Sequence, residues 1–147
     1  MLRKVSRPIE EITPRICTLI DDMIDTMRAA GGCGLAAVQV GVLRRVVVIE
    51  IEDGKVYELI NPKIVAYAGE QEENEGCLSN PGEYGITKRP KAVTVRATDR
   101  YGKEFELNGT DLLARAICHE CDHLDGTLYT DRAIHMLTKD EIKKYIG

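Results

Sequence analysis

The first regular pattern of apolar residues lies near the start of the chain and predicts a helix. Apolar side chains recur at steps of three and four over positions 16–27, which places them on one helical face. Thr13 and Pro14 precede this stripe and suit the N-cap and the first helical position. Gly31 and Gly32 follow the stripe and are expected to end the helix, which we interpret as scaffold.

Several segments carry the patterns of β-strands. Residues 44–51 contain four β-branched residues in succession, which predicts a buried strand. Short apolar or alternating segments predict four more strands, at residues 56–60, 64–68, 92–97 and 104–107. The first two of these are separated by a break at Asn61 and Pro62. The acidic segment 70–75 and residues 80–84 are expected to form loops.

A second helix is predicted after Thr110, which suits its N-cap and is followed by an apolar stripe. Thr138, with Glu141 three residues later, fits the capping box of a short final helix. Strands and helices do not alternate regularly, so the fold class expected is α+β. The sequence contains no internal repeat and no linker-like tract, and we expect residues 1–147 to form one domain.

Composition narrows the function classes. Hydrophobic residues make up 44% and charged residues 30%, with a formal net charge of −4, as is ordinary for a globular protein. The basic residues form no stripe, so we expect no direct nucleic-acid specificity. The sequence shows no apolar run of signal-peptide or membrane-spanning length, which predicts a cytoplasmic protein without membrane association. The cysteines number five, and this odd count favours reduced thiols; we expect Cys118 and Cys121 to be packing residues.

The second helix carries the sequence His119-Glu120-Cys121-Asp122-His123. Residues four apart lie on one face, so both imidazoles can bind one metal ion. Glu120 then lies beside the ligands and can reach a water molecule without binding the metal itself. This H-E-x-x-H pattern is typical of metal-dependent hydrolases.

A catalytic metal site usually has three protein ligands and one open position. One class of proteases takes the third ligand from a histidine, but Tyr129 stands at that position here. We expect His135 to be exposed or structural. Cys77 lies between turn-like glycines and offers a soft thiolate ligand, and spacing alone favours it only slightly over Cys33.

Three segments in this order, residues 32–39 (GCGLAAVQ), 75–79 (EGCLS) and 119–123 (HECDH), resemble the three signature motifs of the peptide deformylases. The similarity covers most of the chain. It implies small antiparallel or mixed sheets around a central helix with the H-E-x-x-H motif, plus an N-terminal helix and a short C-terminal helix. It also implies an enzyme that removes the formyl group from the formyl-methionine terminus of new polypeptides and releases formate.

The resemblance assigns roles residue by residue. It implies a metal site with three ligands, Cys77, His119 and His123, and a catalytic glutamate, Glu120. It implies that Gln39 and the backbone N–H of Leu78 hold the substrate oxygen. It places the extended peptide along a groove that includes Cys33, Gly34, Gly76 and Tyr84.

The implied cofactor is one divalent metal ion per chain, with Fe²⁺ expected as the native metal and Zn²⁺ or Ni²⁺ as alternatives. The partners are N-formyl-methionyl nascent peptides, and the resemblance allows a transient contact with the ribosome. Two positions depart from the family pattern: Cys33 replaces an aliphatic residue, and Tyr84 replaces an arginine found in some members. Glu75 or Asp122 is expected to accept the second N–H of a ligand histidine. Ala116 and Arg115 are expected to line the methionine pocket or, for Ala116, to pack in the core.

Two other functions fit part of the pattern. A metalloprotease that cleaves internal peptide bonds would need a ligand after His123, and none is well placed. A structural metal site would be closed by a fourth protein ligand, for which Cys33 is a candidate.

Overall fold

The computed structural model describes residues 4–52, 54–77, 80–127 and 133–136, and for residues 73–77, 80–85, 87 and 133–136 the description is confined to the backbone. Two α-helices, one short 3₁₀ helix and eight strands make up these residues. In chain order they are α1 (Pro14–Ala29), β1 (Gly34–Ala36), η1 (Ala37–Val40), β2 (Val46–Glu52), β3 (Lys55–Ala68), β4 (Gln71–Cys77), β5 (Asn80–Arg89), β6 (Ala92–Thr98), β7 (Glu104–Thr110), α2 (Asp111–Leu124) and β8 (Ala133–Met136).

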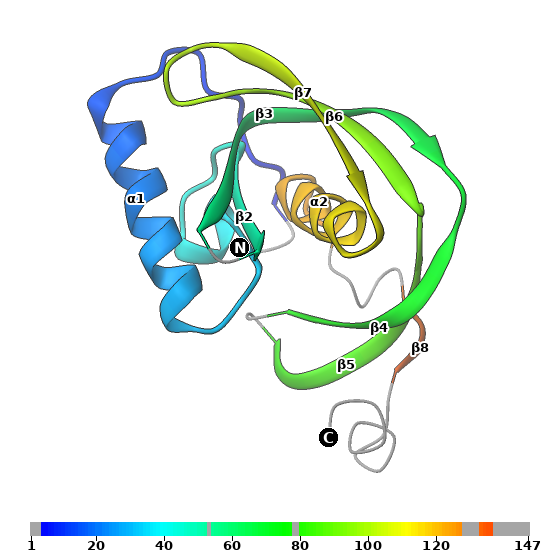
Figure 1. The fold of residues 1–147 in the computed structure, drawn as a ribbon. Coiled ribbons are helices and arrows are strands. Elements are labelled where there is room, and N and C mark those ends of the chain that lie inside the picture. Colours follow the sequence, from blue (N-terminus) through cyan, green and yellow to red (C-terminus); the bar gives the residue numbers. More distant parts are fainter. Residues whose placement is uncertain (1–3, 53, 78–79, 128–132, 137–147) are drawn as a thin grey trace.

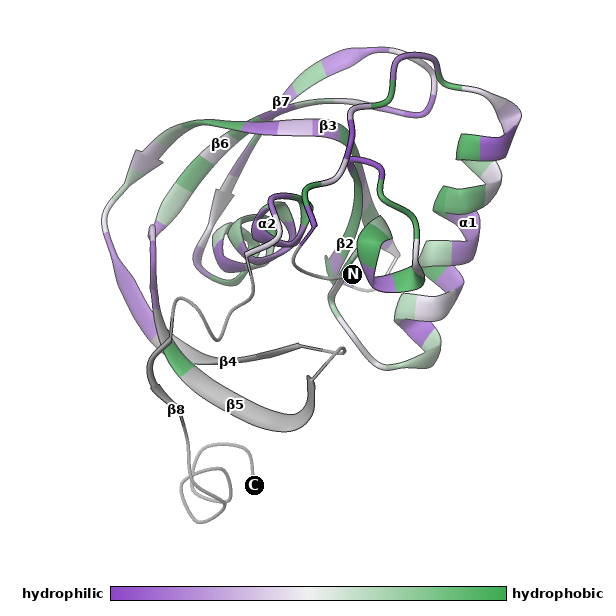
Figure 2. Ribbon diagram, turned by 180° about the vertical axis from the view of Figure 1, so that it is seen from behind, coloured by the Kyte–Doolittle hydropathy of each residue, from purple (hydrophilic) through white to green (hydrophobic). Residues whose placement is uncertain are grey.

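The strands form two antiparallel sheets. The larger sheet has the order β1-β2-β3-β6-β7, and the smaller one has the order β4-β5-β8. Helix α2 lies between them, with the large sheet curving over it and β4 and β5 on its other side (Figure 1). The reverse view shows the same arrangement, with α1 packed on the flank of the large sheet (Figure 2). The predicted α+β fold with a central helix is therefore confirmed.

Strand β2 separates two hydrophobic cores. The side chains of Val47 and Ile49 point to α2, whereas those of Val46 and Val48 point to α1, because successive residues of a strand face opposite sides. All four are fully buried, so the β-branched run forms the buried strand that its sequence predicts. The strand is correspondingly hydrophobic where it passes between the helices (Figure 2).

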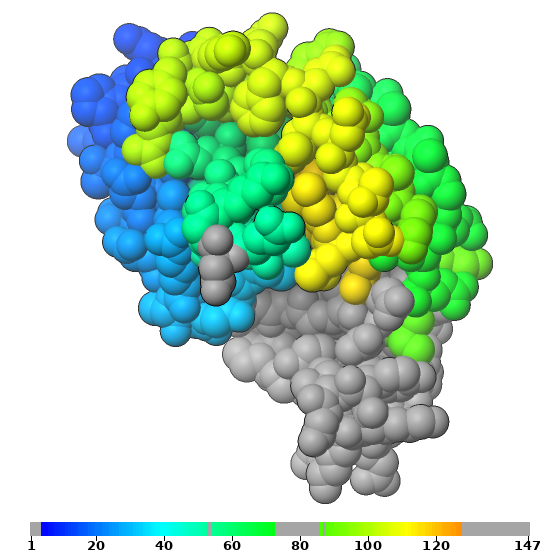
Figure 3. Space-filling model, in the orientation of Figure 1, coloured from blue at the N-terminus to red at the C-terminus, as the bar shows by residue number. Residues whose placement is uncertain are grey.

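The helices match the sequence patterns. Helix α1 begins at Pro14 and buries Ile20, Met23 and Met27, which belong to the predicted apolar stripe. It ends before Gly31, whose φ of 70° is easily adopted only by glycine. Helix α2 follows Thr110, as predicted, and most of its residues are buried. On the face shown in space-filling form, little of the second half of α2 is visible (Figure 3).

The predicted break at Asn61 and Pro62 is a local irregularity within one long strand, β3. Asn61 has a φ of 51°, and the register against β6 shifts between Ile60 and Lys63. The Asn61 side chain accepts a hydrogen bond from the Ile9 N–H at 2.7 Å and donates one to the Ile9 carbonyl at 2.8 Å. The break therefore anchors the N-terminal segment and does not end the strand.

Two loop predictions are wrong. Residues 71–77 form β4, and residues 80–84 belong to β5, with which β4 pairs in antiparallel register. Their polar sequence suggested loops. Strand pairing, however, satisfies the backbone N–H and C=O groups of a polar segment as well as those of an apolar one. Lys88 lies opposite Glu72 and forms an ion pair with it, so part of the charge is matched across the strands.

The predicted final helix, after Thr138, lies outside the described residues. His135 is in β8, where its backbone pairs with Ile86. Within the described part of the chain, neither helix has the length and apolar character that a membrane crossing requires.

Candidate metal centre

Three residues of one turn of α2 form a buried group that could hold a metal ion. His119, Glu120 and His123 are 7%, 5% and 1% exposed, and their possible ligand atoms all lie within 4.8 Å of one another. The two imidazole rings meet edge to face, with centroids 5.0 Å apart. The four-residue spacing that suggested a shared site therefore brings the two histidines together.

The N-terminal end of α2 is anchored to the segment before β6 and to the start of β4. The Asp111 N–H donates to the Lys91 carbonyl at 2.9 Å, and the Asp111 and Lys91 side chains form an ion pair. The Gln71 amide donates to the Pro90 and Asp111 carbonyls, both at 2.9 Å. The first turn of the helix is thus fixed to the start of β4 and to the segment that joins β5 to β6.

The C-terminal end of α2 is anchored directly after His123. The Leu124 carbonyl accepts hydrogen bonds from the Ser6 N–H at 2.7 Å and from Arg45 Nη1 at 3.3 Å. Arg45 also pairs with Asp125 at 3.0 Å, so a cation lies at the negative end of the helix dipole. Gly126 has a φ of 77° and ends the helix, which accounts for a glycine three residues after the motif.

A buried ion pair joins the small sheet to the turn of α2 that carries the two histidines. Arg89, at the end of β5, donates from Nη1 to Asp122 Oδ2 at 2.5 Å. The side chain of Arg89 is 3% exposed and that of Asp122 is 14% exposed. Because Asp122 immediately precedes His123, this contact fixes β5 against the turn that carries both imidazoles.

We expect Asp122→Ala to lower the free energy of unfolding by about 3 kcal/mol, because it removes the anionic partner of a buried arginine. Urea unfolding at equal metal content measures this. The control is Glu106→Ala, which removes an exposed ion pair with Arg96 and should cost less than about 1 kcal/mol. Equal losses in the two variants would contradict the role of the buried pair.

Gln39 lies on η1, and its side chain has a fixed orientation. Its Oε1 accepts a hydrogen bond from the Ala36 N–H at 2.9 Å. Since only the oxygen of the amide can accept from an N–H, the NH₂ group is the end that can donate elsewhere. A half-buried residue thereby presents a donor of known orientation.

Strand β1 ends the large sheet and comes close to Glu120. It pairs with β2 through Gly34↔Ile49, and among the described residues it is the end strand, with an edge that an extended chain could join. A Cβ atom on Gly34 would lie 2.6 Å from Glu120 Oε2. The edge strand and the carboxylate are therefore in direct proximity.

Cys33 precedes β1, and its electrostatic environment links it to the same centre. Although the residue is exposed, loss of hydration among neighbouring atoms raises the pKa of its thiol. The Glu120 carboxylate raises this pKa further, and His119 partly offsets the effect. Among the described residues, Cys33 is not a member of the group that could hold a metal.

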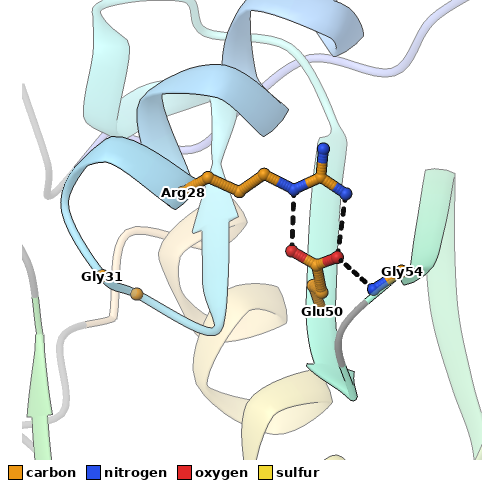
Figure 4. A pocket seen from close by; sticks show the side chains of 5 residues that line it. Arg28, Gly31, Glu50 and Gly54 are labelled. Atoms are coloured by element: carbon orange, nitrogen blue, oxygen red, sulfur yellow. Dashed lines mark hydrogen bonds and ion pairs between the residues drawn. The ribbon is translucent and has the colours of Figure 1, made fainter.

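The loop that carries Cys33 is held on β2. The Glu50 N–H donates to the Cys33 carbonyl at 2.9 Å. The Glu50 side chain accepts from Arg28 at 2.9 and 2.8 Å and from the Gly54 N–H at 3.0 Å (Figure 4). These hydrogen bonds, with that from Arg28 as the largest effect, lower the pKa of Glu50 to about 2. The hollow around this pair is also lined by Gly31, Gly32 and Gly54, and none of the three clustered residues of α2 is part of its lining.

Comparison with known proteins decides the family. The sequence model described as "Polypeptide deformylase" matches residues 1–139. A peptide deformylase of Acetivibrio thermocellus is 55% identical over 144 residues, which cover 98% of this chain and 84% of that protein. The chain belongs to the polypeptide deformylase family. It is therefore a metal-dependent hydrolase that removes the N-formyl group from nascent polypeptides.

Solved deformylase structures have the same fold. The Legionella pneumophila deformylase superimposes with a TM-score of 0.87 at 44% identity, covering 98% of this chain and 84% of that one. The Synechococcus elongatus deformylase, in complex with actinonin, also gives 0.87 at 39% identity, covering 99% of this chain and 78% of that one. The family expected from the three sequence motifs is confirmed, and the rival reading as a metalloprotease is not supported.

Other predicted site residues of this deformylase are described only in part. Cys77 is the last residue of β4, and its backbone is in register with Asn80. The backbone of Gly76 pairs with that of Tyr84, so these two predicted groove residues lie opposite each other in β4 and β5. Leu78 lies outside the described residues. The roles proposed for these four positions stay predictions.

The remaining predictions around the motif concern packing. Cys118 and Cys121 are buried in the core between α2 and the large sheet, as predicted, and burial raises the pKa of the Cys121 thiol. Ala116 belongs to the same core, which favours the packing alternative. Arg115 is half-buried.

Sequence reasoning missed the residues that fix α2 in this deformylase. Arg45 and Arg89 come from distant segments, and no spacing rule joins either of them to the helix. The proximity of Gly34 to Glu120 was equally hidden in the sequence, although the family resemblance placed both residues near the substrate. Each of these contacts depends on how strands pack on the helix.

Proposed function

We propose that Cys77, His119 and His123 hold one divalent metal ion and leave a coordination position open for water. The observation that carries this proposal is the buried group on α2, in which two imidazoles have ligand atoms within 4.8 Å of each other and of Glu120. Two neutral nitrogen donors fit a divalent transition metal, and a thiolate would complete a three-ligand catalytic set. When bound, such an ion lowers the pKa of water and polarises a carbonyl oxygen.

Fe²⁺ is the native metal in this proposal, with Zn²⁺ and Ni²⁺ as alternatives that the same donors accept. A thiolate and two imidazoles suit all three ions, so affinity alone does not choose between them. A thiolate-ligated ferrous ion oxidises readily, which gives the iron form a distinct sensitivity to air. Metal identity is accordingly a matter for direct measurement.

Glu120 moves the protons of the reaction. Glu120 is 5% exposed, and its carboxylate lies close to both imidazoles, so it could reach a water molecule bound there. As a base it accepts a proton from the attacking water, and as an acid it passes one to the departing amine. Both tasks need a single group that changes its protonation state, and an amide at this position could not perform them.

Two N–H donors of the chain would hold the developing oxyanion, and a bound ion would add positive charge nearby. Gln39 supplies its side-chain amide, whose donor end is set by the hydrogen bond from Ala36 to its oxygen. Leu78 supplies its backbone N–H. Donors that are already oriented stabilise the transition state without reorganisation, and loss of one commonly costs about 10²–10³ in rate.

The substrate is a formyl-methionyl nascent peptide that binds as an extended strand, and formate is released. The position of β1 at the end of its sheet supports this mode, since edge hydrogen bonds bind a backbone without demanding a sequence. Cys33, Gly34 and Gly76 line the groove, and Tyr84 contacts residues after methionine. We place residues 1–147 in one catalytic domain that works in the cytoplasm and contacts the ribosome transiently.

The test is to purify the protein without oxygen, quantify its bound metals, and measure formate release from a formyl-methionyl peptide. We expect one divalent ion per chain, mainly iron, and activity that falls during aerobic storage. An acetyl-methionyl peptide is the matched substrate control, because a site shaped for formyl excludes the extra methyl group.

Full activity after complete removal of the metal would contradict the proposed centre. Equal activity of the iron form before and after prolonged aerobic storage would contradict iron as the native metal but leave the ligand set intact.

A further inference from the structure

Gly34 lies against the carboxylate of Glu120. A Cβ atom at position 34 would be 2.6 Å from Oε2 and 3.1 Å from both Cδ and Cγ of Glu120. Such a separation is too short for non-bonded atoms, because attractive contacts between heavy atoms lie near 3.5–4.0 Å. The carboxylate therefore occupies the volume that any side chain at position 34 would need.

We infer that Gly34 is a positioning residue for the reaction: its missing side chain gives Glu120 the place from which it moves protons. This inference rests on the proposed role of Glu120. It assigns to Gly34 a function separate from backbone contact with the peptide, because alanine would keep the same N–H and C=O groups and add only a methyl group.

Strand β1 cannot withdraw to relieve the contact. Gly34 is paired with Ile49, and the preceding Cys33 carbonyl accepts a hydrogen bond from the Glu50 N–H at 2.9 Å. Glu50 is in turn held by the two hydrogen bonds from Arg28 (Figure 4). A shift of β1 would disturb this whole set of contacts.

Helix α2 cannot withdraw either. Gln71 binds its first turn through the Asp111 carbonyl, and Ser6 and Arg45 bind its last turn through the Leu124 carbonyl. The helix is also packed against the large sheet by its buried residues. With both backbones fixed, a methyl group at position 34 must displace the Glu120 side chain.

The need for glycine here is steric and not conformational. The glycines with positive φ in the described residues include Gly31, Gly41 and Gly54 but not Gly34. Gly31 is the opposite case, since its φ is 70° and a Cβ there would meet nothing within 4 Å. Gly34→Ala is consequently free of backbone strain and isolates the effect of one methyl group.

The first measurement is the steady-state kinetics of Gly34→Ala with its metal content determined. We expect kcat to fall about 10²-fold, as is usual when a reacting group is displaced by about 1 Å, with KM and bound metal unchanged. A raised KM with unchanged kcat would overturn the inference and assign Gly34 to the groove alone.

Gly109→Ala is the matched control. A Cβ at Gly109, in β7, would lie 2.9 Å from Ile117 Cδ1 and 3.0 Å from Leu113 Cγ, so it crowds the same helix away from Glu120. We expect it to lower stability while the folded enzyme keeps its kcat. A similar loss of kcat in this control would attribute the effect to general crowding of α2 and overturn the inference.

A stability cycle tests the contact without using activity. Gly34→Ala should lower the urea midpoint in the natural background and have little effect beside Glu120→Ala, where the carboxylate is gone. Equal shifts in both backgrounds would overturn the inference. If Glu120→Gln stayed active while the cycle showed coupling, the catalytic role of Glu120 would fail and the steric fit would stand.

Discussion

Glu120→Gln is expected to keep its bound metal and to lose about 10⁴-fold in the rate of deformylation, near the upper end of what general acid–base catalysis contributes. The amide has nearly the size of the carboxylate, so it fits the space beside Gly34 and leaves the imidazoles in place. It can neither accept a proton from water nor give one to the amine. Formate release and metal analysis on the same sample measure the two effects.

The control for this variant is Glu106→Gln on β7, which changes the same functional group at an exposed ion pair with Arg96. It should leave both metal content and kcat unchanged. Retained turnover in Glu120→Gln would remove Glu120 from the mechanism. Loss of metal from that variant would instead identify Glu120 as a metal ligand. The measurement distinguishes the two roles, since Glu120 belongs to the group whose atoms could hold an ion.

Cys77→Ala is expected to weaken metal binding by more than about 10²-fold. Loss of a residue that only hydrogen-bonds to a metal ligand already weakens binding by about 10–100-fold, and loss of a ligand itself should cost more. Activity should disappear with the metal. The reason is the number of ligands: His119 and His123 alone leave a two-donor site, whereas catalytic sites usually have three protein ligands. Metal content after dialysis against a weak chelator is the measurement.

Cys33→Ala is the matched control for metal content. Sequence spacing alone allows either cysteine to be the third metal ligand. Among the described residues, Cys33 is not part of the group that could hold a metal ion. We expect Cys33→Ala to bind metal like the natural protein. The reverse pattern, with metal lost on substitution of Cys33 and kept on substitution of Cys77, would refute the ligand assignment and favour a site built on the loop before β1.

Patterns of apolar residues predicted the parts of the fold that are buried, on one face in α1 and on both faces in β2. The stripe over residues 16–27 and the β-branched run in β2 each have one arrangement that hides their apolar side chains. Strands β4 and β5 could not be found in this way, because their polar sequence gives no periodic signal. Their pairing comes from backbone hydrogen bonds and cross-strand contacts such as Lys88 with Glu72.

The candidate site also contains residues that local sequence patterns predict and contacts that they do not. His119, Glu120 and His123 are close in sequence, so helical spacing alone brought them together. Cys77 comes from another element, and only the order of the three motifs separated it from Cys33. The contacts of Arg45 and Arg89 with α2 depend on tertiary packing, which a single sequence does not encode in any local spacing.

The hydrogen bond from Ser6 to the Leu124 carbonyl joins the last turn of α2 to a segment near the start of the chain. Arg45 reaches the same turn from just before β2, and Gln71 reaches the first turn from β4. Contacts between such distant segments form late, because long loops must close before they are gained. We therefore expect the imidazole pair to reach its final setting only after these long-range contacts have formed, so a partly folded chain would bind the ion less tightly than the folded one.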